Sequence, residues 1–286
     1  MASLIKQIKK IGLVWLCAAA LSACAGANSF VDLEAVDPTA ASKGNIASLT
    51  KVIKENPQDA AAYNTRGSAY GTAGQPRLAL ADFNKAIAID SNFYQAYGNR
   101  AVIQKASGNT EEAIADYSKA LQINSQYDAA YIGLGNIYRE KGNSPKALEN
   151  YNKAITLGTT DPRAFHNRGL LYQINNRNSE AIEDFTTAIS LAPREAAPWN
   201  GRGASYLAIG NTKSALVDFN ESLRRDSQSF RAWTNNGFAN EKVGNIKKAN
   251  RAYRNALKLQ PNHAPALQGL ARLEANKSKT TKPSPD

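Results

Sequence analysis

Residues 60–93 read AAAYNTRGSAYGTAGQPRLALADFNKAIAIDSNF, and residues 94–127 read YQAYGNRAVIQKASGNTEEAIADYSKALQINSQY, in matching register. The pattern returns every 34 residues, each time with an alanine at the same position. A strict period of this length is typical of a helical solenoid, in which each unit buries its apolar face against its neighbours. The repeated alanines are Ala79, Ala113, Ala147, Ala181, Ala215 and Ala249.

Three further positions recur with the same 34-residue period. A small residue lies twelve residues before each alanine, an aromatic lies four after it, and another small residue lies seven after it, as in Gly67, Phe83 and Ala86. Small residues let two helices approach closely, and aromatic side chains fill the space between them. Each unit is therefore expected to hold two helices joined by a tight turn. The turn carries a residue type that adopts the left-handed conformation at a helix end, namely Gly74, Gly108, Gly142, Asn176, Gly210 and Gly244.

This pattern resembles the tetratricopeptide repeat. The resemblance implies an all-α, right-handed α-solenoid with six full repeats over residues 60–263. Residues 44–59 resemble the second half of a degenerate leading repeat, and residues 264–276 are expected to form a capping helix. Residues 277–286 contain no apolar side chain to bury, so we expect a disordered tail.

The N-terminus has the pattern of a secretory signal. Residues 1–23 begin with lysines, continue with an apolar run of about 13 residues, and end with small residues. The run is too short to span a bilayer as a helix. The segment Leu21-Ser22-Ala23-Cys24 resembles the lipobox of bacterial lipoproteins, which implies that Cys24 carries acyl chains such as palmitate and becomes the first residue of the mature protein. An ordinary signal peptide with a chance cysteine is the alternative.

The same resemblance implies a location. Ala25, rather than an aspartate, follows Cys24, and in lipoproteins of two-membrane bacteria this favours transfer to the outer membrane, facing the periplasm. Two or three acyl chains make a stable anchor, whereas one chain holds a protein only marginally. Residues 24–43 have no clear period and are expected to form a flexible tether.

Partner-binding residues follow from the repeat mapping. Tetratricopeptide arrays present the inner face of their first helices as a groove, and asparagine amides there can hold the main chain of an extended peptide. Leu170 and Phe238 make the later repeats more apolar. Ordinary polar residues on a wet face, and ordinary packing between helices, are the alternatives that remain open. The candidate groove residues are Asn64, Asn99, Asn136, Asn167, Leu170, Asn200, Asn235 and Phe238.

Other repeat positions also carry polar residues. Gln104 and Asn240 replace a tyrosine found in other repeats, which indicates either looser packing or a polar group presented for a purpose. Four arginines share the seventh position of their repeats, and we expect their stems to be buried and their charged heads exposed. These are Arg66, Arg100, Arg168 and Arg202.

The formal net charge of +11 is unevenly distributed. Residues 224–258 hold nine basic and two acidic residues. Within them Lys247, Arg251, Arg254 and Lys258 follow helical spacing and are expected to form one basic patch on the outer surface. The patch is either a solvated face or a site for an anionic partner: an acidic protein, lipid headgroups or another envelope polyanion. A secretory signal argues against nucleic acid as a partner.

Residues typical of catalysis are scarce. The chain has two histidines, His166 and His263, in different repeats, and no second histidine or cysteine stands at metal-ligand spacing from either. No glycine-rich phosphate loop or nucleophile elbow occurs. We therefore expect no catalytic residues, no metal and no cofactor.

By resemblance, the nearest functional type is the NlpI-like tetratricopeptide lipoprotein of Gram-negative bacteria. This implies an adaptor that is attached to the membrane by its N-terminal lipid and binds periplasmic or outer-membrane proteins, such as peptidoglycan hydrolases or a processing protease. The alternative is a pilotin lipoprotein that assembles a pilus or secretion-system secretin. The sequence leaves the partner, the envelope process and the oligomeric state open, a homodimer included.

Overall fold

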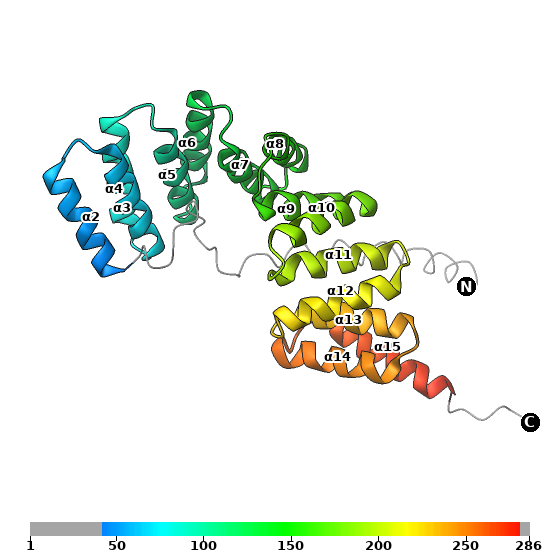
Figure 1. The fold of residues 1–286 in the computed structure, drawn as a ribbon. Helices are drawn as coiled ribbons and strands as arrows, with labels where there is room; N and C mark the ends of the chain where they lie inside the picture. Colours follow the sequence, from blue (N-terminus) through cyan, green and yellow to red (C-terminus); the bar gives the residue numbers. More distant parts are fainter. Residues whose placement is uncertain (1–41, 281–286) are drawn as a thin grey trace, which may run out of the picture. The chain divides into compact units, whose positions relative to one another are not determined.

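The computed structural model describes residues 42–280 (Figure 1). In this part of the chain all regular structure is α-helical, with 14 helices, which confirms the expected all-α repeat fold. Residues 1–23 and Cys24 lie outside the described residues, as do most of the expected tether and residues 281–286. No helix between residues 42 and 280 is both long and apolar enough to cross a membrane.

The chain divides into two compact units at Thr159 and Thr160. We call the described part of the first unit 1 (residues 42–159) and that of the second unit 2 (residues 160–280). Unit 1 contains α2 (Lys43–Glu55), α3 (Ala60–Thr72), α4 (Pro76–Ile89), α5 (Tyr94–Ala106), α6 (Thr110–Ile123), α7 (Asp128–Glu140) and α8 (Ser144–Thr156). Unit 2 contains α9 (Pro162–Ile174), α10 (Asn178–Leu191), α11 (Ala196–Ala208), α12 (Thr212–Arg225), α13 (Phe230–Lys242), α14 (Ile246–Leu259) and α15 (Ala264–Thr280).

Each repeat is a pair of helices joined by a tight turn. The first and second helices of every repeat pack against each other, and within each unit the second helix also contacts the next repeat. All six expected turn residues have positive φ, including Asn176 at 57°, which is the one non-glycine residue with positive φ among those described. The turn prediction is therefore confirmed.

The small residues and the aromatics meet as expected. Phe83 is fully buried, and a Cβ atom added to Gly67 would lie 2.8 Å from Phe83 Cε1. Tyr151 is also fully buried, and a Cβ on Gly135 would lie 2.6 Å from its ring. The aromatic ring therefore occupies space that any larger residue on the first helix would need.

The two terminal helices close the ends of the array. In α2 the Ser42 side chain accepts a hydrogen bond from the Asn45 amide and caps the helix. At the other end, α15 packs on α13 and α14 and runs to Thr280. The expectation of a disordered tail from residue 277 was therefore wrong for residues 277–280. The preceding turns of α15 contain the helix-favouring residues Leu270, Ala271, Leu273, Glu274 and Ala275, and no glycine or proline lies between Gly269 and Pro283.

Candidate partner-binding surface

Four arginines on first helices are held by aspartates of the second helix in the same repeat, sixteen residues later. Arg202 Nε donates to Asp218 Oδ2 at 2.8 Å, and its second terminal nitrogen donates to Oδ1 at 2.9 Å. The Asp218 side chain is only 3% exposed, so this forked contact supplies hydrogen bonds that water cannot reach to make. The equivalent pairs are Arg66–Asp82, Arg100–Asp116, Arg168–Asp184 and Arg202–Asp218.

The expectation that these arginine heads are exposed was therefore wrong, because a buried carboxylate holds each of them. Hydrogen bonding to Asp218 raises the pKa of Arg202, which keeps the guanidinium charged. Burial raises the pKa of Asp184 even though Arg168 acts against the shift, which shows how strongly the site is desolvated. The pairs stabilise the repeats and leave little of either charge for a partner.

Repeats three and six lack this pair. Repeat three has Leu134 and Asn150 at the two positions, and repeat six has Asn236 and Ala252. In repeat six Asn236 donates to Asn220 Oδ1 at 2.9 Å, and the buried Asn240 donates to Asn236 Oδ1 at 2.9 Å. The polar residue at position 240 thus belongs to a buried amide network and does not face a partner.

In each unit the first helices carry a candidate surface, which we call the first-helix face: α3, α5 and α7 in unit 1, and α9, α11 and α13 in unit 2. In unit 1, Asn99 Nδ2 donates to Asn64 Oδ1 at 3.1 Å and to Ser68 Oγ at 3.4 Å. Asn99 is 4% exposed, whereas Asn64 is half-buried. Within residues 42–280 the Asn64 NH₂ group donates to no other residue, so it is the amide that a partner can reach.

Unit 2 repeats the arrangement with a different pair. Asn235 Nδ2 donates to Asn200 Oδ1 at 3.0 Å, and both residues are half-buried. Among the described residues, no hydrogen bond engages the Asn200 NH₂ group or the Asn235 carbonyl oxygen. One donor and one acceptor therefore remain side by side, which is the combination that a peptide group of an extended chain requires.

Two other expected asparagines lie apart from these pairs. Asn136, on α7, accepts a hydrogen bond from the buried Tyr151 hydroxyl at 2.7 Å, and burial raises the pKa of Tyr151. Its carbonyl oxygen is thereby tied to the core of unit 1. Asn167 is half-buried on α9.

Apolar residues lie on the first helices of unit 2. Leu170 and Phe238 are half-buried, and Ile174 at the end of α9 is exposed. The Phe238 ring is flanked by two cations, with Lys242 Nζ 5.4 Å and Arg272 Cζ 5.7 Å from its centroid. A partner at Phe238 therefore meets an aromatic ring beside the Lys242 ammonium, while the charge of Arg272 is paired with Glu241.

Arg272 also ties the closing helix to repeat six. Its guanidinium donates to both oxygens of Glu241, at 3.0 and 2.9 Å, and the Tyr253 hydroxyl donates to Glu241 Oε2 at 2.6 Å. Burial raises the pKa of Glu241, but the hydrogen bonds from Arg272 and Tyr253 outweigh this effect and the pKa is lowered. Glu241 is therefore ionised, and it holds α15 against α13 and α14.

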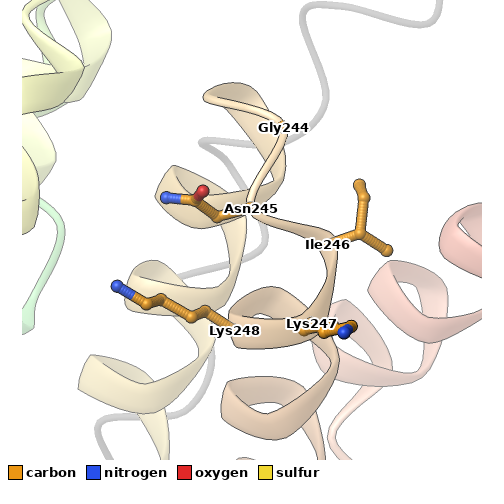
Figure 2. A pocket seen from close by; sticks show the side chains of 5 residues that line it. All are labelled: Gly244, Asn245, Ile246, Lys247 and Lys248. Carbon is orange, nitrogen blue, oxygen red and sulfur yellow. The ribbon is translucent and has the colours of Figure 1, made fainter.

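The residues of the expected basic patch are all exposed on α14. At the start of this helix, the α13–α14 turn forms a shallow depression of about 350 Å³, lined by Gly244, Asn245, Ile246, Lys247 and Lys248. Figure 2 shows the Lys247 and Lys248 side chains extending from α14 in different directions, beside Ile246. The patch is Lys247, Arg251, Arg254 and Lys258.

The two histidines lie among aromatic rings. His166 is 5.5 Å from Phe185 and His263 is 4.8 Å from Phe230, measured between ring centroids. Burial and the nearby Arg231 lower the pKa of His263. Within residues 42–280, no group of three or more His, Cys, Asp or Glu side chains is arranged to hold a metal ion.

Family comparisons identify the repeats. Models described as the tetratricopeptide repeat match residues 60–93, 94–127 and 162–195, and a model described as the TPR repeat matches residues 135–176. The resemblance to this repeat is thereby confirmed, and the fold is one of protein–protein interaction scaffolds. The narrower resemblance to NlpI-like lipoproteins stays a prediction. No curated protein matches the sequence.

Solved structures share the fold. PilF of Pseudomonas aeruginosa superimposes with a TM-score of 0.69 at 19% identity, over 76% of this chain and 100% of PilF. A chain from the structure of the APC/C hetero-tetramer Cut9–Hcn1 gives 0.69 at 20% identity, but this chain spans only 47% of that chain. YrrB, described as a TPR protein with an unusual peptide-binding site, gives 0.58 at 26% identity over 66% of this chain and 97% of YrrB.

Proposed function

We propose that this chain, which is built from tetratricopeptide repeats, is an outer-membrane-anchored periplasmic adaptor that binds extended segments of envelope proteins on its first-helix face. The observation that carries the proposal is the Asn200–Asn235 pair, which leaves an amide donor and a carbonyl acceptor together on unit 2. Such a pair binds main chain without demanding a particular sequence. The lipobox-like segment that ends at Cys24 supports the membrane location.

Side-chain selection is supplied by the neighbouring apolar residues. Leu170 and Phe238 lie on the same set of first helices, and Lys242 beside Phe238 favours a segment that combines an apolar residue with an acidic one. The peptide-binding site described for YrrB, which is 26% identical, supports a peptide as the ligand class.

Crosslinking of the native protein in isolated membranes, followed by mass spectrometry, tests the proposal. We expect peptidoglycan hydrolases or a periplasmic protease among the captured proteins. The Leu170→Glu and Phe238→Glu double variant should lose this capture while its circular dichroism is unchanged. Lys242 lies beside Phe238 and offers a glutamate at position 238 an opposite charge, whereas Arg272 is already paired with Glu241.

A matched control places the same substitutions on second helices. Leu78 on α4 and Val217 on α12 are exposed, so Leu78→Glu and Val217→Glu should leave capture intact. Capture that survives in the Leu170/Phe238 variant would exclude the first-helix face of unit 2. Capture of a secretin or a pilus subunit would replace the adaptor proposal with the pilotin alternative.

A further inference from the structure

Helix α14 concentrates positive charge as no other helix of residues 42–280 does. It carries five basic residues and no acidic residue. By contrast, α12 also holds basic residues, but Glu221 pairs with Arg224 and Arg225 there. The basic residues of α14 are Lys247, Lys248, Arg251, Arg254 and Lys258.

These five side chains are exposed, and none forms an ion pair with a described residue. Arg254 donates only to the neutral Asn250 side chain, at 2.8 Å. Like charges three or four residues apart on a helix repel one another and destabilise it slightly. The stripe therefore does not stabilise unit 2, and an anion that would compensate it has to come from outside the described fold.

Aliphatic side chains lie at the same end of the helix as the first lysines. Val243 is 45% exposed and Ile246 is 47% exposed, at the turn that leads into α14. Repeat five also has an exposed aliphatic residue, Ile209, at the first of these positions but the polar Thr212 at the second, and repeat three has Lys141 and Ser144. Exposed aliphatics bordered by lysines are the composition of surfaces that lie in a bilayer interface. An acidic protein would match the same charge, and its binding to α14 is the result that would overturn the bilayer assignment below.

We propose that the α13–α14 turn and the basic stripe of α14 form a contact surface for a phospholipid bilayer with anionic headgroups. Lys247, Arg251, Arg254 and Lys258 bind headgroup phosphates, and Val243 and Ile246 enter the interface. The inference rests on the membrane location in the proposed function, but it uses none of the residues of the first-helix face. It assigns unit 2 its own membrane contact, separate from the N-terminal lipid.

Vesicle cosedimentation of the full chain tests this assignment, with Cys24→Ser present throughout to remove the lipid. The probes are vesicles of phosphatidylcholine alone and vesicles of phosphatidylcholine with phosphatidylglycerol. Neutralising the patch (K247Q, R251Q, R254Q and K258Q) should lower binding to the anionic vesicles at least about tenfold. All proteins compared share one N-terminus, so its contribution cancels.

The matched control removes the same charge from unit 1. Lys43, Lys51, Lys54 and Lys85 are exposed on α2 and α4, and their replacement by glutamine should leave most of the binding intact. Ile246→Thr copies Thr212 of the preceding repeat without a change of charge. It should weaken binding about threefold. This single variant keeps the test decisive if the quadruple patch variant melts at a lower temperature.

Three results would overturn the proposal: unchanged binding of the patch variant, equal loss in the unit 1 control, or no binding to anionic vesicles while an acidic polypeptide binds α14. The last would assign the stripe to a protein partner. Capture through the first-helix face should persist in the patch variant, so this proposal and the adaptor proposal can fail independently.

Discussion

Single replacements of Arg202 and of Asp218 are each expected to destabilise unit 2 strongly. The double variant should lose much less stability than the sum of the two single losses. Asp218 is nearly inaccessible to solvent and accepts two hydrogen bonds from Arg202, at 2.8 and 2.9 Å. Removing either residue leaves the other charge buried without its partner, which costs about 3–5 kcal/mol. The double variant leaves no such charge.

Repeat six supplies the replacement residues. It has Asn236 and Ala252 at the equivalent positions, so Arg202→Asn with Asp218→Ala copies a combination that this chain already folds with. We expect about 3 kcal/mol or more for each single variant and a coupling energy of at least about 2 kcal/mol between them. The loss that remains in the double variant reflects the contacts of the Arg202 head with the Trp199 ring, at 5.0 Å, and with Thr186.

Urea unfolding followed by tryptophan fluorescence measures these values. Trp199 and Trp233 are the tryptophans within residues 42–280, and both belong to unit 2. Arg224→Gln is the control, because its ion pair with Glu221 is exposed and should contribute less than about 1 kcal/mol. Single-variant losses that simply add, with a coupling energy below about 0.5 kcal/mol, would refute the view that the pair acts as a unit.

Three further outcomes are expected from substitutions outside this pair. Gly210→Ala should lower the free energy of unfolding by about 1 kcal/mol in urea titrations, because φ is +83° there although the added Cβ meets open space. Gly135→Ala should cost about 1–3 kcal/mol, since its Cβ would lie 2.6 Å from the Tyr151 ring; unchanged stability would mean that the ring moves freely. Because the pKa of His263 is lowered in the fold, the unfolded chain binds this proton more tightly, and the melting temperature should fall as the pH drops below about 6.5. His263→Gln should flatten that part of the profile, and a proton titration of His263 by NMR should place its pKa below the value of an unfolded peptide.

Much of the fold could be predicted because the repeat imposes it locally. The turn at Asn176 and the contact of Gly67 with Phe83 each follow from a residue type recurring at one position. The Arg–Asp pairs were missed although their signal was present: an aspartate stands sixteen residues after each of the four arginines. A repeat position alone gives an arginine no partner, and a charged head without a known partner is assigned to solvent.

The candidate surface was harder to predict, since it depends on side chains of neighbouring repeats. Asn99 and Asn235 occupy the same repeat position, yet Asn99 is buried against Asn64 and Ser68, while Asn235 is half-buried beside Asn200. Repeat mapping alone gave both residues the same role. The difference arises from which residue the preceding repeat places opposite each amide.

The two surfaces proposed for unit 2 lie on different helices of the repeats. Phe238 belongs to the first helix of repeat six, α13, whereas Arg251 and Arg254 belong to the second helix, α14. The buried residues Ala249 and Tyr253 mark the side of α14 that packs against the rest of the unit, so the basic stripe faces away from that contact. A peptide held on first helices therefore does not compete with headgroups held on α14. The two proposals are therefore compatible, because together they let the same repeat bind a partner while it rests on a bilayer.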